Sequence, residues 1–176
     1  AYLVNELKLK PLAIHLDNGW NSKLAVKNIE RIIKILNIDL ITHEIEWEEF
    51  KDLQKSYFKA SVIDIEALTD HAIAGALYKY AYKFNIKYII DGANVTTEGV
   101  VPDSWVHYKN DLLNIKDIQK RFGIKKIKTF PKLGFFRLQF YKHIMGIKMI
   151  SILNYIDYEK EKNKDTIIEK LEWVDY

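Results

Sequence analysis

Short apolar runs alternate with amphipathic segments along most of this chain, and this alternation is the feature that most restricts its fold. The runs that have the length and composition of buried strands are 11–17, 39–45, 87–91 and 147–153. Segments with apolar residues at helical spacing separate them. Strands that alternate with helices predict an α/β fold, a Rossmann-like parallel sheet with helices on both faces, because right-handed crossovers place the helices there.

The expected helices are amphipathic and have local start and stop signals. Ser22 and Thr69 are expected N-caps, and Gly146 is expected to end one helix. The first helix lacks such a start signal, so we expect the natural chain to begin before Ala1. The helices are expected at 1–9, 22–36, 46–60, 70–84, 111–122, 133–144 and 157–171.

The composition is that of a globular domain. The chain has 176 residues, of which 48% are hydrophobic and 29% charged, enough for one domain with a sizeable core. No apolar run approaches the ~18 residues of a membrane span, and no signal peptide is evident, so we expect no span and a cytoplasmic location. The absence of cysteine excludes a disulfide framework, a thiolate metal site and a cysteine nucleophile within these residues.

Positive charge is concentrated in one segment. Residues 116–148 contain ten Lys or Arg and a single acid, Asp117, whereas the whole chain has a net charge of only +3. Such a block is most often a solvated face. The alternative is a surface that receives phosphate from a nucleotide, a nucleotide-sugar or RNA.

Polar segments follow several of the buried elements, at 15–22, 69–71 and 91–98. Ligands of parallel sheets bind outside the carboxyl ends of the strands, so we expect these segments to meet at one edge. Gly92 and Ala93 would let a ligand approach the backbone closely.

Each of these residues also has an ordinary structural explanation. A histidine inside a strand, such as His15, is more often a core residue than a ligand. Asp17 and Asn18 are common turn residues, and Asp70 is favoured at a helix start by the helix dipole. Their recurrence at the ends of separate elements favours a binding site.

The order of these segments resembles that of a known family. It runs strand, Asp17-Asn-Gly-Trp-Asn-Ser22, helix, strand, Glu46-Trp-Glu-Glu-Phe-Lys-Asp-Leu-Gln54, Thr69-Asp-His-Ala72, strand and Gly92-Ala-Asn-x-x-Thr-Glu-Gly99. This order is similar to that of the PP-loop ATP pyrophosphatase superfamily, and within it to the N-acetyl sugar amidotransferases of bacterial surface-polysaccharide and lipopolysaccharide biosynthesis. Residues 128–131 and 153–158 fit the same family, so the resemblance covers nearly all of a single domain, 1–176.

One hallmark of the superfamily has no counterpart here, the phosphate-binding Ser-Gly-Gly-x-Asp-Ser loop. The resemblance implies that the first strand and this loop are missing, that the domain is truncated at both ends, and that residues 1–176 alone lack ATP pyrophosphatase activity. The implied strand order, 3-2-1-4-5, would leave a vacant place between 11–17 and 87–91. We therefore expect these strands about 9–10 Å apart instead of the roughly 4.8 Å of direct pairing, with the missing strand supplied by an upstream segment or another chain.

The resemblance also implies a chemistry, with ATP and Mg²⁺ as cofactors. AMP is transferred from ATP to the amide oxygen of an N-acetyl sugar or nucleotide-sugar, and ammonia from a partner glutaminase subunit then displaces AMP. An acetamido group becomes an acetamidino group. The magnesium would neutralise the departing pyrophosphate.

Residue roles follow from the same resemblance. Asp17 and Glu98 would be catalytic, and Glu98 is also a candidate magnesium ligand. The residues expected near the nucleotide are His15, Gly92, Ala93, Asn94 and Thr97. Those expected near the acceptor sugar are Asn18, Trp20, Asn21, Asp70, His71 and Trp105.

Two other functions are left open. A tRNA-modifying PP-loop enzyme would use the basic segment to bind RNA, although the lack of cysteine makes nucleic acid the less expected partner. A nucleotide-binding domain without catalysis would explain the missing phosphate loop. A homo-oligomer is compatible with the sequence.

Overall fold

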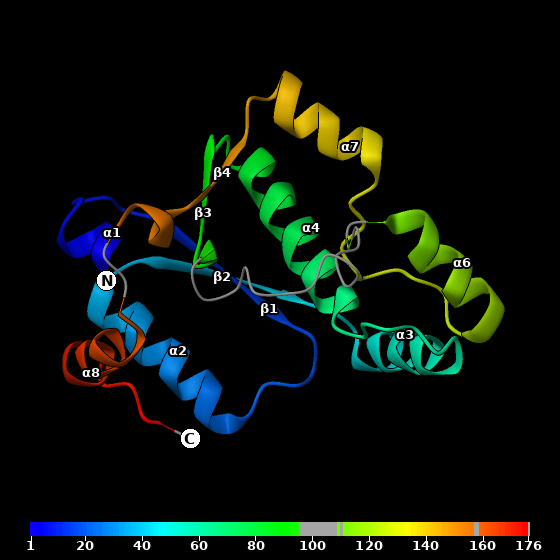
Figure 1. Cartoon of the computed structure of the whole chain (residues 1–176), viewed down its shortest axis with the longest axis horizontal. Helices are drawn as coiled ribbons and strands as arrows, with labels where there is room; N and C mark the ends of the chain where they lie inside the picture. The colour runs from blue at the N-terminus through cyan, green and yellow to red at the C-terminus, as the bar shows by residue number, and fades with distance from the viewer. Residues whose placement is uncertain (96–108, 110, 157–158, 176) are drawn as a thin grey trace.

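A computed structural model gives the fold, and it describes residues 1–95, 109, 111–156 and 159–175 (Figure 1). The elements follow in the order α1 (Tyr2–Asn5), β1 (Leu12–Asp17), α2 (Lys23–Leu36), β2 (Asp39–Glu44), α3 (Trp47–Lys59), α4 (Ala67–Lys83), β3 (Tyr88–Asp91), α6 (Leu112–Phe122), α7 (Phe135–Gln139), a π-helical turn (Phe140–Ile144), β4 (Lys148–Ser151), a 3₁₀ turn (Ile152–Tyr155) and α8 (Lys160–Leu171).

The strands form two parallel pairs. β1 pairs with β2 from Leu12 opposite Asp39 to Asp17 opposite Glu44, and β3 pairs with β4 in a second two-stranded sheet. The expected mixed α/β class with parallel strands is therefore confirmed. Among the described residues β1 and β3 are not hydrogen-bonded to each other, which agrees with the vacant place expected between 11–17 and 87–91.

Helix α4 links the two strand pairs, since it contacts both β1 and β3 (Figure 1). Ala72, Gly75 and Ala76 are buried on this helix. A side-chain carbon added at Gly75 would lie 2.9 Å from both the Cβ and the carbonyl oxygen of Pro131. Small residues therefore let α4 pack closely against its neighbours.

Two apolar clusters lie along α4. One gathers α3, α6 and the start of α4 around Phe50, Leu53 and Phe130. The other gathers the end of α4, β3 and the α7 region, where the rings of Tyr78 and Tyr141 stack with their centroids 5.9 Å apart. The same helix thus serves as a wall of both cores.

Helix α3 holds residues 128–130 through a buried carboxylate. Glu49 is only 2% exposed, and it accepts hydrogen bonds from the backbone N–H of Lys128 (2.9 Å), Thr129 (3.0 Å) and Phe130 (2.8 Å). The Thr129 hydroxyl donates to the same carboxylate and accepts from the Glu46 N–H. A buried charge that is this fully hydrogen-bonded fixes the position of the segment.

Several element boundaries differ from those expected. Ser22 caps α2 as predicted, accepting from the Ala25 N–H at 3.0 Å. Thr69 is not an N-cap, because α4 begins two residues earlier, after a turn in which Asp64 accepts from the Glu66 N–H. The first helix ends early, at Asn5, and Lys8 has a positive φ three residues later.

Two further boundaries were also wrong. The helix expected at 133–144 begins after Gly134 and changes to a π-helical turn at Phe140. The last strand ends at Ser151 and continues as a 3₁₀ turn.

Within the described ranges, no helix is long and apolar enough to cross a membrane.

We expect Glu49→Ala to lower the free energy of unfolding by about 2–4 kcal/mol, because it leaves three backbone N–H groups without their acceptor, one of them, that of Phe130, fully buried. Urea denaturation at pH 7 measures this change. Glu48→Ala, at an exposed position on the same helix, is the matched control and should cost less than about 0.5 kcal/mol. An equal loss in the two variants would contradict the role given to Glu49.

Candidate functional site

The carboxyl end of β1 carries a cluster of three polar side chains. The Asn21 amide nitrogen donates to Asp17 Oδ1 at 2.9 Å and lies 3.3 Å from His15 Nε2. Asp17 Oδ1 also accepts from the Gly19 N–H at 3.0 Å. Donation from Asn21 to Nε2 leaves the imidazole proton on Nδ1. Of the predicted site residues, His15, Asp17 and Asn21 are therefore brought together.

Two tryptophans form an aromatic wall beside this cluster. Trp20 packs edge-on against Trp47 of α3, with centroids 5.5 Å apart, and its indole N–H donates to Gln54 Oε1 at 2.9 Å. Asn18 Oδ1 accepts a hydrogen bond from the backbone N–H of Trp20 at 3.3 Å. Trp20 is still 65% exposed. An exposed aromatic face beside hydrogen-bonding groups is suited to a sugar or a base.

Gly19 is required by this arrangement. Its φ of +85° lies in the left-handed region, and an added side-chain carbon would collide with the Trp47 ring. Gly92, at the end of β3, is different: no atom of the described residues lies within 4 Å of such a carbon. The space at Gly92 leaves its backbone accessible to a ligand.

The loop after β3 is braced against the loop after β4. Asn94 is 5% exposed, and its amide nitrogen lies 3.5 Å from the Leu153 carbonyl oxygen. The Val95 N–H donates to Asn154 Oδ1 at 3.0 Å, and the Ala93 N–H to Asp91 Oδ1 at 3.1 Å. Asn94 therefore supports this loop, and the exposed Gly92 and Ala93 are the groups that a ligand can reach.

Asp70 and His71 are adjacent in sequence but have different environments. Asp70 pairs with Lys109 Nζ at 2.6 Å, and Asp64 lies 3.2 Å from the same ammonium. The hydrogen bond that the Lys109 ammonium donates to Asp70 raises the pKa of Lys109 against the effect of its burial. Asp70 thus remains near the surface, engaged by a lysine that the sequence did not single out.

His71 is fully buried in the core. Its Nε2 accepts from the Leu133 N–H at 3.1 Å, and its ring stacks on Phe130 at 5.6 Å. Burial lowers its pKa to about 4, although the Lys109 backbone and the Asp111 carboxylate act in the opposite direction. The Nδ1 atom has no hydrogen bond of good geometry within the described residues. This environment is that of a neutral core histidine, and it keeps His71 away from a sugar at the surface.

The remaining predicted site residues, Thr97, Glu98 and Trp105, lie outside the described residues. The catalytic and magnesium-binding roles of Glu98 stay predictions. In the ranges that the structure covers, no group of three or more His, Asp or Glu side chains could hold a metal ion.

Two contributors to the β1 site were missed in the sequence, Trp47 and Gln54. They are seven residues apart, which places them on the same face of an amphipathic helix. The seven-residue spacing could have shown that Trp47 and Gln54 lie on one face of the helix. It could not show that this face is turned towards the β1 loop, because that depends on how α3 packs against Gly19.

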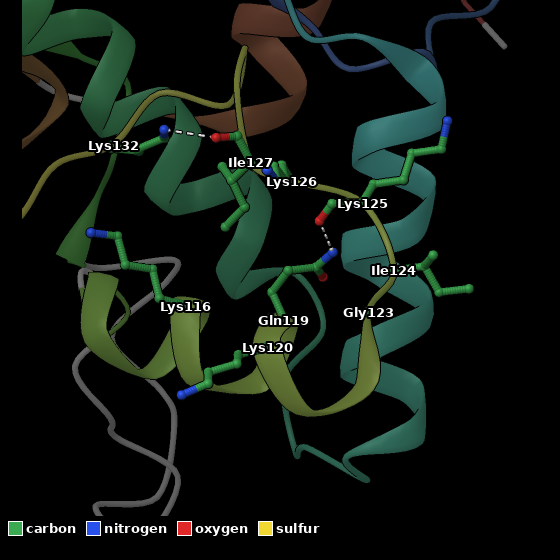
Figure 2. A pocket seen from close by; sticks show the side chains of 9 residues that line it. All are labelled: Lys116, Gln119, Lys120, Gly123, Ile124, Lys125, Lys126, Ile127 and Lys132. Carbon is green, nitrogen blue, oxygen red and sulfur yellow. Dashed lines mark hydrogen bonds between the residues drawn. The ribbon is translucent and has the colours of Figure 1, made fainter.

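The basic segment forms a separate cavity of about 380 Å³. Figure 2 shows Lys116 and Lys120 extending from α6 and Lys125 extending away from them, while Lys132 Nζ donates to the Ile127 carbonyl at 2.8 Å. Lys126 also lines this cavity. Clustered lysine side chains of this kind attract polyanions electrostatically and with little specificity.

A second carboxylate of α3 anchors this basic segment. Asp52 Oδ2 accepts from the backbone N–H of Ile124 and Lys125, both at 2.8 Å, and from the Gln119 amide. Burial would raise the pKa of Asp52, yet the Lys125 and Ile124 N–H groups and Gln119 hold it below its usual value. The segment is therefore held by its main chain, which leaves most of its lysine side chains exposed.

Comparisons with known protein families, characterised proteins and solved structures find no match to this chain. The family resemblance therefore stays a prediction from the sequence motifs.

We expect Gly19→Ala to displace Trp47 and to destabilise the fold by about 1–3 kcal/mol, because the alanine would be strained and would collide with the ring. Near-ultraviolet circular dichroism and tryptophan fluorescence report the displacement, and urea denaturation gives the stability. Gly92→Ala is the matched control, since its side chain would meet no atom of the described part of the chain. Unchanged tryptophan spectra in Gly19→Ala would show that the loop does not depend on this contact.

We expect the stability to fall as the pH decreases from about 6.5 towards 4, because the unfolded chain then binds a proton at His71 that the folded chain excludes. The free energy of unfolding should fall by on the order of 3 kcal/mol across this pH window. Above about pH 6.5 His71 is neutral in both the folded and the unfolded chain, so its effect on stability no longer changes with pH. Burial also lowers the pKa of His43, which acts in the same direction.

Urea unfolding over a pH series tests this expectation. His71→Phe should show a shallower pH dependence than the wild type, while His143→Gln, at an exposed position, should follow the wild type. Equal slopes for the wild type and His71→Phe would rule out His71 as the source.

Proposed function

We propose that this chain is part of an ATP-dependent amidotransferase that activates the N-acetyl group of a sugar or nucleotide-sugar for attack by ammonia. The observation that carries the proposal is the His15–Asn21–Asp17 cluster beside the exposed face of Trp20. It lies at the carboxyl end of a parallel strand, where α/β sheets bind their ligands. In this proposal the two strand pairs belong to one Rossmann-like sheet.

The proposed reaction has two balanced steps. The amide oxygen attacks the α-phosphorus of ATP, a P–O bond forms, and pyrophosphate leaves. Ammonia then adds to the activated carbon, AMP departs with the former amide oxygen, and a proton is released. A partner glutaminase supplies the ammonia.

Within this scheme the residues of the chain mainly position the substrates. Trp20 would stack on the sugar, and Asn18 and Asn21 would hydrogen-bond to it. The accessible backbone at Gly92 and Ala93 would lie along the nucleoside. Asp17, held by Asn21 and Gly19, would keep its carboxylate at the reacting groups.

Mg²⁺ usually takes only one or two carboxylates and completes its shell with phosphate oxygens and water, and Glu98 is the candidate carboxylate ligand. When bound, the ion would neutralise the pyrophosphate.

The basic cavity supports a second candidate, a tRNA-modifying enzyme. Its lysines lie on α6 and on the segment that follows. If RNA is the ligand, its affinity should fall steeply with salt, whereas a nucleotide-sugar held by stacking should depend on salt far less. A domain that binds nucleotide without catalysis is the third candidate.

We expect Trp20→Ala to weaken binding of UDP-N-acetylglucosamine by about tenfold, through loss of the stacked ring. Isothermal titration of the 176-residue chain measures the affinity, and binding is the readout because the chain lacks the phosphate loop. Phe136→Ala, which removes another highly exposed aromatic ring, is the control. Absence of saturable sugar-nucleotide binding, together with salt-dependent tRNA binding, would favour the second candidate instead.

A further inference from the structure

A smaller cavity, of about 240 Å³, lies between α4, α7 and the connection 123–134 that joins α6 to α7 (Figure 1). Its lining includes four cationic side chains, those of Lys79 on α4, Lys128 and Lys132 on the connection, and Arg137 on α7. Typical small-molecule sites have volumes of roughly 300–1,000 Å³. This cavity is smaller, so it is suited to a small ion or to one charged group of a larger ligand.

The chain that lines this cavity has no acidic residues. Residues 71–90 and 118–156 contain no Asp or Glu. Glu49 contacts the connection, but its two oxygens accept from the N–H groups of 128–130 and from the Thr129 hydroxyl. Among the described residues, none of the four cations forms an ion pair. One buried carboxylate is therefore set against four positive charges.

Three of these cations keep their donors free for a ligand. The Lys132 ammonium donates to the Ile127 carbonyl at 2.8 Å, and Lys132 also lines the larger basic cavity (Figure 2). The Lys79 ammonium lies 5.4 Å from the centroid of the Tyr80 ring, a contact that leaves its N–H donors unbonded. The side chains of Lys128 and Arg137 have no polar partner within the described ranges.

A tyrosine adds a neutral donor to the same cavity. Tyr141 is 7% exposed and lines the cavity, and its ring stacks on that of Tyr78. Its hydroxyl has no hydrogen bond in the part of the chain that the structure describes, and it is not sealed off from solvent. This hydroxyl can therefore donate to an acceptor that enters the cavity.

The walls of the cavity are fixed before any ligand binds. Glu49 holds residues 128–130 through their backbone N–H groups. His71 Nε2 accepts from the Leu133 N–H at 3.1 Å, which fixes the end of the connection against α4. A set of donors that is already in place loses little conformational entropy on binding.

We propose that this cavity binds a phosphate or diphosphate group, either as a free ion or as part of a small molecule. Phosphate oxygens accept hydrogen bonds from Lys, Arg and Tyr donors, and the guanidinium of Arg137 can bind two of these oxygens at once. The charge of the group offsets the surplus of cations, whereas a single carboxylate would leave most of them unpaired. The cavity shares no residue with the His15–Asn21–Asp17 cluster, so the inference does not depend on the proposed amidotransferase.

His43 reports the charge in this cavity. Its Nε2 lies 3.2 Å from the Thr129 carbonyl oxygen, and its Nδ1 lies 3.1 Å from the Tyr80 hydroxyl. Burial lowers the pKa of His43, the hydrogen bond to the Thr129 backbone raises it, and the charge of Lys79 lowers it. An anion bound beside Lys79 offsets that charge, so it should raise the pKa of His43.

Isothermal titration of the 176-residue chain with inorganic pyrophosphate and with inorganic phosphate tests the proposal. We expect saturable binding of pyrophosphate and about tenfold weaker binding of phosphate, which carries fewer charges. Arg137→Met and Lys79→Met should each weaken pyrophosphate binding about tenfold. Lys116→Met removes the same charge from the larger cavity, and it should change the affinity by less than about twofold.

Two further measurements separate a lost site from a lost fold. Removal of one of several like charges relieves repulsion, so Lys79→Met should not lower the urea midpoint without ligand. NMR titration of the His43 ring should show a higher pKa with pyrophosphate than without it, in the wild type and in Lys116→Met.

Competition identifies the source of the phosphate. Displacement of pyrophosphate by ribose 5-phosphate would support the proposal and assign the site to a phosphate ester. Absence of displacement, with pyrophosphate still bound in the cavity, would support it and assign the site to the free ion.

Three results would overturn the proposal. The first is equal pyrophosphate affinity in the wild type, Arg137→Met and Lys79→Met. The second is pyrophosphate binding that leaves the pKa of His43 unchanged. The third is tRNA that displaces pyrophosphate and itself binds more weakly to Arg137→Met, which would make the cavity part of an RNA-binding surface.

Discussion

The fold depends on two carboxylates of α3 that bind the backbone of a distant segment. Glu49 and Asp52 are three residues apart, so they lie on the same face of the helix. Together they accept hydrogen bonds from the N–H groups of residues 124, 125 and 128–130. Without these acceptors the segment would have several unpaired donors close to the core, where unpaired donors are most costly.

The fixed segment connects the two halves of the molecule. Phe130 fills the cluster around α3, and Leu133, only three residues later, fills the cluster around β3. His71 connects the same parts, because it stacks on Phe130 and accepts from the Leu133 N–H. Helix α4 carries His71 and contacts both strand pairs, so the anchored segment and this helix together hold apart two strand pairs that do not bond to each other.

The sequence was most informative where the determinants are local. Ser22 caps α2 as predicted, because an N-cap needs only a side chain and an N–H three residues later. The strand positions and their parallel pairing also followed from apolar runs and the connecting helices. The grouping of Asp17 and Asn21 at the end of β1 belongs to this class, because both residues lie in one short loop.

The sequence was least informative where distant residues decide the outcome. His71 carries the same local signal as a surface helix start, and only the packing of Phe130 and the Leu133 N–H makes it a core residue. Trp47 reaches the β1 loop because Gly19 has no side chain in the way. The division of the strands into two pairs agrees with the vacant place that the family resemblance implies between 11–17 and 87–91, but no local pattern in the sequence predicts it.

The anchoring of the basic segment has a consequence for how this surface can change. Glu49 and Asp52 bind main-chain N–H groups, which every residue except proline provides. The side chains at 125, 126 and 128 can therefore be exchanged without loss of these bonds. The attachment constrains the path of the chain and leaves its charge free to vary, so over evolutionary time this face can gain or lose affinity for anions while the fold beneath it is preserved.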